Sequence, residues 1–74
     1  MREVIIGKKY RHFKNLEVIV LHIGYDAFTT KKVVIYEELK DNKIWVRDYE
    51  EFTSLVDKEK YPEVKQKYRF EEVD

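Results

Sequence analysis

The chain has no cysteine, one proline and two glycines. Without cysteine it cannot form a disulfide framework, a thiolate zinc site or a cysteine nucleophile. With so few glycines and prolines, its turns must be made mainly by Asp, Asn and Lys. It also lacks any apolar run near the roughly 20 residues of a membrane span. The apolar stretch after Met1 is too short for a signal peptide, so we expect no membrane association and a cytoplasmic protein.

The chain also lacks an excess of charge of either sign: 15 basic and 15 acidic residues give a net charge of zero. Non-specific binding to a phosphate backbone needs a basic surplus, so it is not favoured. The 74 residues suffice for a single small β-rich domain, residues 1–74. Such a chain buries only roughly 60–65% of its extended surface, so its core needs most of its large apolar side chains.

Short β-branched runs predict a mainly β fold. Residues 16–23 have the apolar character of a central strand with both faces covered, and residues 26–31 are typical of an exposed loop. Residues 32–39 and 43–47 predict two further strands that form a hairpin. We therefore expect a small, strongly curved sheet or an SH3-like half-open barrel of about four or five short strands with one short helix.

The hairpin prediction includes a turn and a register. Asp41 and Asn42 both tolerate positive φ, as a two-residue type I′ turn requires. That turn places Tyr36 opposite Arg47 on the facing strand. Alternation then divides the side chains between two faces. The face expected to form the core carries Val33, Ile35, Leu39, Ile44 and Val46, and the other, amphipathic face carries Val34, Tyr36, Glu38, Trp45 and Arg47.

Asp48 and Glu51 have the spacing of a capping box, which predicts a short helix over residues 49–56. The helix is expected to bury Phe52 and residues 55–56.

The rest of the chain is predicted to be loop and short extended segments. Residues 57–66 contain the proline and predict a loop, and residues 67–73 predict a charged edge strand. Near the start, residues 4–6 predict a short strand and residues 10–14 an extended segment.

The amphipathic face supplies the strongest candidate binding site. Aromatic faces can stack on a planar ring, an arginine can pair with an anion, and an acid or imidazole can orient the ligand. The residues of this candidate site are Tyr36, Trp45, Arg47, Tyr10, His12 and Glu38. A purely structural alternative makes Tyr36 and Arg47 a cross-strand cation–π pair and Trp45 a second layer of core.

Catalytic and metal sites find little support in the sequence. His12 and His22 lack a third ligand at motif spacing, so we expect no metal and no cofactor. We expect a ring nitrogen of each histidine to form a hydrogen bond with the backbone. The single serine, Ser54, has no nucleophile-elbow glycines around it, the glutamate pairs are adjacent in sequence and diverge, and no glycine-rich phosphate loop is present. We therefore expect a protein that is not an enzyme.

Several segments also follow one another in a familiar order. They are Tyr10-Arg11-His12-Phe13-Lys14, Val33-Val34-Ile35-Tyr36, Ile44-Trp45-Val46-Arg47, then Phe52, and finally Arg69-Phe70. In these segments and in their order, the chain resembles the small bacterial family called domain of unknown function sixteen fifty-three. The chain departs from that family at Asn15 (usually glycine), at Asp48 (usually proline) and in the loop 24–30. The resemblance implies a fold of short strands and no chemistry.

Three function hypotheses follow. The first is a non-enzymatic binding module that recognises a planar or anionic small ligand, such as a nucleotide-like one. The alternative is a protein–protein interaction domain or homodimer, which uses the same aromatic face or an exposed sheet edge. The third is nucleic-acid binding through residues 8–14, where positive charge alternates with aromatic rings.

Overall fold

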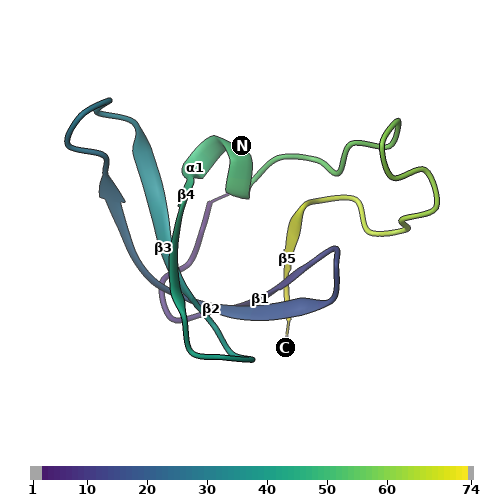
Figure 1. The fold of residues 1–74 in the computed structure, drawn as a ribbon, viewed down its shortest axis with the longest axis horizontal. Helices are drawn as coiled ribbons and strands as arrows, with labels where there is room; N and C mark the ends of the chain where they lie inside the picture. The colour runs from purple at the N-terminus through teal and green to yellow at the C-terminus, as the bar shows by residue number, and fades with distance from the viewer. Residues whose placement is uncertain (1–2, 74) are drawn as a thin grey trace.

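The computed structural model describes residues 3–73, and in that range it contains one curved antiparallel sheet and one short helix (Figure 1). The strands run in the order β4-β3-β2-β1-β5 across the sheet. The elements are β1 (Lys9–His12), β2 (Leu16–Tyr25), β3 (Lys32–Glu38), β4 (Ile44–Asp48), α1 (Tyr49–Phe52) and β5 (Phe70–Glu72). The predicted mainly β fold with one short helix is confirmed. No helix within residues 3–73 is long and apolar enough to cross a membrane.

The predicted central strand is β2, which pairs with both β1 and β3. Its register against β3 shifts between Val20 and His22, so Leu21 is an extra residue in a β-bulge. A bulge bends its strand and reverses the alternation of side chains beyond it. Val20 and Ile23 therefore both contact the core. His22 lies in the central strand, as expected, but its side chain is exposed and forms no hydrogen bond to the backbone of residues 3–73, contrary to the prediction.

The loop 26–31 is exposed, as predicted. The Asp26 Oδ1 atom accepts hydrogen bonds of 2.8 Å from the amides of Phe28 and Thr29. These bonds stabilise the charged carboxylate and hold the pKa of Asp26 below its usual value.

The predicted β3–β4 turn and register are wrong. The Glu38 amide donates to the Lys43 carbonyl at 2.8 Å, so the loop is residues 39–42. Of these residues only Asn42 has a positive φ, of 60°, whereas a type I′ turn needs it at both central residues. The Asp41 side chain instead accepts from the Lys43 amide at 3.1 Å.

As a result, Tyr36 lies opposite Trp45 and not opposite Arg47. This shift of two residues leaves every side chain on its predicted face, because alternation has a period of two.

The assignment of the core to one face of that hairpin is wrong for β4 and for Val34 and Tyr36, although Val33, on the predicted core face, is buried. Val34 and Tyr36, on the face predicted to be amphipathic, are 0% and 5% exposed, whereas Ile44 and Val46 are 62% exposed. The reason is tertiary: the sheet curves around the Val34 face, and aromatic rings from distant segments fill the concave side. Ile35 and Leu39, also on the expected core face, are half-buried and so less exposed than Ile44 and Val46.

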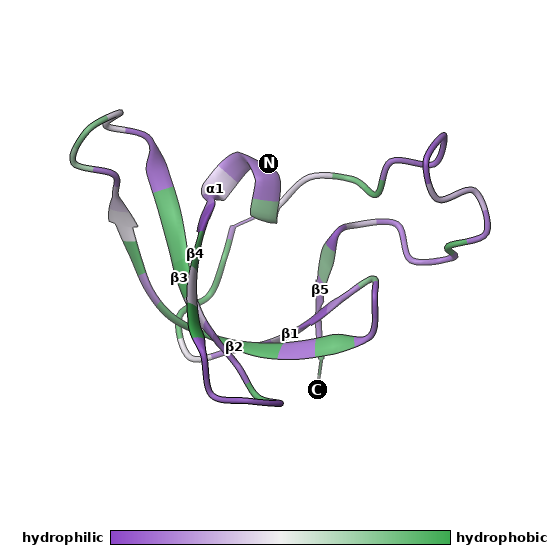
Figure 2. Ribbon diagram, in the orientation of Figure 1, coloured by the Kyte–Doolittle hydropathy of each residue, from purple (hydrophilic) through white to green (hydrophobic). Residues whose placement is uncertain are grey.

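The core joins the two ends of the sheet through aromatic side chains. The rings of Phe52, from α1, and Phe70, from β5, stack with centroids 4.1 Å apart, and Tyr10 from β1 meets Phe52 edge-on at 5.4 Å. Figure 2 shows apolar residues along β2 and β3, while the long segment between α1 and β5 is mainly hydrophilic. The buried core cluster contains Val4, Tyr10, Val18, Val20, Val34, Tyr36, Tyr49, Phe52 and Phe70.

The helix is shorter than predicted and has no capping box. It ends at Phe52, and Asp48 makes no side-chain cap hydrogen bond. The hydroxyls of Thr53 and Ser54 donate to helix carbonyls at 2.9 and 2.7 Å, and such local bonds compete with continued helix. Val56 is buried as predicted, but Leu55 is exposed.

The remaining segments follow the predictions in part. Residues 57–66 form the predicted loop, whereas the predicted edge strand 67–73 is reduced to β5. Residues 4–6 are not a strand. The amides of Val4 and Ile5 donate to the hydroxyls of Tyr49 and Tyr10 instead, at 2.9 and 3.0 Å.

Candidate functional site

A cleft of about 270 Å³ lies where the β1–β2 turn meets the chain before β5. Every strand and the loop around Tyr61 contribute to its walls. Its lining residues are His12, Phe13, Lys14, Leu16, Val18, Tyr36, Glu38, Arg47, Tyr61, Arg69 and Phe70.

His12, at the end of β1, is the buried polar group of this cleft. Its Nδ1 atom accepts a hydrogen bond of 3.1 Å from the Lys14 amide, within the turn that leads to β2. A neutral imidazole whose Nδ1 accepts must carry its proton on Nε2. The turn therefore fixes both the ring and its tautomer, and leaves a donor on the side of the ring away from the Lys14 amide.

The cleft is electropositive. Burial, followed by the charges of Arg47, Arg69 and Lys14, lowers the pKa of His12 from 6.5 to about 4. The imidazole is therefore neutral near pH 7. The lining then holds three cations and the single carboxylate of Glu38, although the whole chain has a net charge of zero.

Both arginines of the cleft are held in place. The Arg47 Nε atom donates to the Tyr36 hydroxyl at 3.3 Å, and its Nη1 atom donates to Glu51 at 3.2 Å. The Arg69 Nε atom donates to the Ser54 hydroxyl at 3.2 Å. A guanidinium carries five N–H donors, so these bonds orient each group without using all of its donors.

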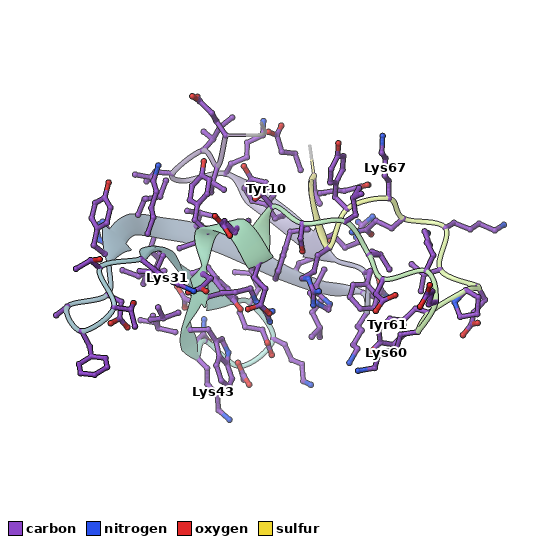
Figure 3. All side chains as sticks on the ribbon, turned by 90° about the horizontal axis from the view of Figure 1, so that it is seen from above. Tyr10, Lys31, Lys43, Lys60, Tyr61 and Lys67 are labelled. Atoms are coloured by element: carbon purple, nitrogen blue, oxygen red, sulfur yellow. The ribbon has the colours of Figure 1, made fainter. Side chains whose placement is uncertain are left out.

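Aromatic rings border the cationic part of the cleft. The rings of Phe13 and Tyr61 lie 4.8 Å apart, and both side chains are half-buried. The Lys14 ammonium lies 6.0 Å from the centroid of Phe13 and 5.7 Å from that of Tyr61. Figure 3 shows Tyr61 and Lys60 side by side on the long loop, and the Lys60 ammonium is also 5.7 Å from the Tyr61 ring. The cleft thus combines partly accessible aromatic surface with positive charge.

The structure brings four of the six predicted site residues together in this cleft: His12, Tyr36, Glu38 and Arg47. Tyr36 does not offer a stacking face, because its ring packs against Phe52 and Phe70 at 5.6 Å. Its contact with Arg47 is a hydrogen bond to the hydroxyl, and the Arg47 guanidinium instead lies 5.4 Å from the Phe70 centroid.

The other two predicted residues lie outside the cleft lining. Tyr10 is 2% exposed and belongs to the core, where its hydroxyl accepts from the Ile5 amide. Trp45 is 45% exposed on β4, so it is not the second layer of core that the structural alternative expected.

Sequence reasoning missed Tyr61 and Arg69 as site residues. Tyr61 is an aromatic residue within an otherwise polar, proline-containing loop, and Arg69 precedes a buried phenylalanine. Tyr61 therefore gave a weak local signal, whereas Arg69 gave none, because a charged residue next to a buried one is ordinary strand alternation. However, only the folded chain places them beside His12, which is far away in sequence.

A second hollow, of about 280 Å³, is lined by Lys31, Lys32, Asp48, Tyr49 and Glu50. Its two lysines are balanced by two carboxylates. Lys31 lies 4.0 Å from Asp48, and the Lys32 ammonium already lies 4.3 Å from the Tyr49 centroid. This hollow therefore offers no unbalanced charge. Across residues 3–73, no group of three or more metal-ligating side chains is gathered in one place.

The family called "Protein of unknown function (DUF1653)" matches residues 8–72, so the chain belongs to that family. This confirms the resemblance seen in the sequence. Asn15, in the β1–β2 turn beside the cleft, has a φ of 67°, and asparagine is among the few residues that adopt such a conformation readily. The glycine that the resemblance implies at this position would suit the same conformation. No curated protein and no solved structure matches the chain.

Proposed function

We propose that this protein is a non-enzymatic binding module whose cleft holds a small anion attached to a planar group, as in a nucleotide-like ligand. The observation that carries the proposal is the gathering of Lys14, Arg47 and Arg69 around the buried, neutral His12. An electropositive recess within a chain of zero net charge is suited to an anion.

Each part of the cleft has a role in this proposal. The two oriented guanidinium groups donate to the anion, and planar forks of this kind suit phosphate and carboxylate oxygens. The His12 Nε2–H adds a neutral donor. The partly exposed rings of Phe13 and Tyr61 supply the surface on which a planar group stacks.

Nucleic-acid binding through residues 8–14 finds less support in the geometry. Lys9 and Arg11 both pair with Glu17, at 3.7 and 3.1 Å. Neither lines the cleft to which Lys14 contributes. The positive charge of the segment is therefore divided between two places and does not form one strip.

The test is an amide-shift titration of the isotope-labelled protein with adenosine monophosphate, adenosine and inorganic phosphate. We expect adenosine monophosphate to shift the amides of residues 12–14, Tyr61 and Arg69, and to bind more tightly than either of its parts. A bound anion should also raise the pKa of His12 above about 4, because it offsets the neighbouring cations.

The matched control uses two neighbouring cations. Lys14→Ala removes a cation of the cleft, whereas Arg11→Ala removes an exposed cation that does not line it. We expect weaker binding only for Lys14→Ala. Equal effects of the two variants, or shifts that avoid the cleft with all three probes, would refute the proposal.

A further inference from the structure

The edge strand β4 has an uncovered apolar segment. Ile44, Trp45 and Val46 are 62%, 45% and 62% exposed. Successive strand residues point to opposite faces, so exposure of all three means that neither face of the strand is well covered here. β4 is an end strand of the sheet and pairs only with β3 within residues 3–73 (Figure 1).

The backbone of β4 is ready to pair with another strand. The bond from the Glu38 amide to the Lys43 carbonyl marks this pair as a hydrogen-bonded one. Hydrogen-bonded and non-hydrogen-bonded pairs alternate along an antiparallel ladder. Trp45 and Arg47 therefore bond β3, and the N–H and C=O groups of Ile44 and Val46 point away from the sheet.

The charges on and next to β4 favour one register for pairing with a copy of itself over the two neighbouring registers. In a twofold antiparallel pair with Val46 opposite its own counterpart, Trp45 lies opposite Arg47 of the second copy, and Ile44 lies opposite Asp48. Sliding the pair by two residues in one direction places Lys43 opposite Arg47, and sliding it in the other direction places Arg47 opposite itself. Like charges directly opposite each other destabilise a sheet, whereas tryptophan and arginine attract.

We propose that β4 pairs with β4 of a second copy of this chain, antiparallel and with Val46 on the twofold axis. The partner is a second copy of this chain because β4 itself carries the outward backbone groups and apolar side chains that a partner strand needs. It can also pair with itself in a register that avoids charge repulsion. Such an isologous contact is closed, so assembly stops at the dimer. It also brings Trp45 of each copy next to Arg47 of the other, at the edge of that copy's cleft.

The proposal is tested by the mass of the protein in solution, measured by sedimentation or by light scattering after gel filtration. The wild-type chain should be a dimer. Val46→Lys and Val46→Glu should each be monomeric, because each places two like charges opposite one another. An equimolar mixture of the two variants should form a heterodimer, since opposite charges then meet. A monomeric wild-type chain, or a mixture that stays monomeric, would overturn the proposal.

Two further measurements guard against effects on the fold. Phe28→Lys adds a charge at a residue that is exposed but lies outside β4, and it should leave the dimer intact. Hydrogen exchange of the wild-type chain needs no substitution: the amides of Ile44 and Val46 should become more protected as the protein concentration rises. If these two amides exchange rapidly at every concentration, or if only Phe28→Lys dissociates the dimer, the β4 interface is wrong.

Discussion

The edge strands β4 and β5 end the same sheet and differ in what covers them. β5 places Phe70 in the core at 1% exposure, and the carboxylate of Glu71 accepts from the amides of Lys67 and Tyr68 at 3.2 and 3.1 Å. β4 exposes Ile44, Trp45 and Val46 together. The chain before β5 folds back onto that strand, and residues on both sides of its start line the cleft. β4 contributes Arg47 to the same cleft but leaves its apolar segment exposed.

The largest expected difference between the two edges is in stability. Phe70→Ala removes a ring that stacks on Phe52, and such core truncations cost about 3–5 kcal/mol. Val46→Thr, at an exposed position of β4, should change the free energy of unfolding by less than about 0.5 kcal/mol. Urea unfolding at one low protein concentration measures both. If Phe70→Ala has no stable folded state, Phe70→Leu should still be clearly less stable than Val46→Thr, and equal losses would contradict the comparison.

Acid should lower the free energy of unfolding through His12, which lies in the cleft. Its pKa is about 4 in the folded chain, against an ordinary value of 6.5 that the unfolded chain keeps, so the unfolded state binds the proton more readily. The free energy of unfolding should therefore fall as the pH drops from 6.5 to about 4, by on the order of 2–3 kcal/mol, and this contribution should then level off. The stability that His12 contributes as a neutral group is fully present above pH 6.5.

Two histidine variants isolate this effect in urea unfolding over the same pH range. His12→Gln should remove this part of the slope, and His22→Gln, with an exposed side chain, should retain it. A slope that persists in His12→Gln would assign the pH dependence to other groups.

A smaller effect is expected at the hydroxyl of Tyr36. Tyr36→Phe removes the acceptor of the Arg47 Nε bond and should cost about 0.5–1.5 kcal/mol. It should also weaken anion binding, because Arg47 loses one of the contacts that orient it. Tyr25→Phe, at a residue that is 71% exposed, is the control and should be close to wild type in unfolding and in titration. A Tyr36→Phe variant with unchanged affinity would mean that this bond does not position Arg47.

The smallest effect on stability is expected at Trp45. Trp45→Phe keeps an aromatic ring at a half-exposed edge position and should change the free energy of unfolding by less than about 0.5 kcal/mol. Thermal unfolding at low protein concentration measures it. A loss as large as that of Phe70→Ala would show that Trp45 is part of the core and would remove the contrast between the edges.

Local sequence was sufficient to predict β2, β3 and β4, although it also predicted a strand at residues 4–6 that does not form and made the helix and the last strand too long. The β-branched run of β2, the polar loop 26–31 and the hairpin between residues 32 and 47 were all recognisable, because strand propensity and turn chemistry act between near neighbours. Alternation also placed each side chain of that hairpin on the correct face, since a shift of two residues preserves it. Four of the six predicted site residues share the cleft. Alternation accounts for three of them, because Tyr36, Glu38 and Arg47 lie on one face of β3 and β4.

Local pattern was insufficient wherever the outcome depended on distant residues. The burial of Tyr36 and the exposure of Val46 follow from the curvature of the sheet and from rings supplied by α1 and β5. The bulge at Leu21 sets the position of His22, and it depends on pairing with β3.

The sequence by itself determined a small, neutral, mainly β chain with a short helix and the three strands β2, β3 and β4, because these properties depend on composition and on neighbouring residues. The tertiary structure decided which face became the core, which edge stayed open, and that Tyr61 and Arg69 meet His12. These outcomes depend on aromatic rings from β1, α1 and β5 that are buried together against one curved sheet. No single segment of the sequence contains that information.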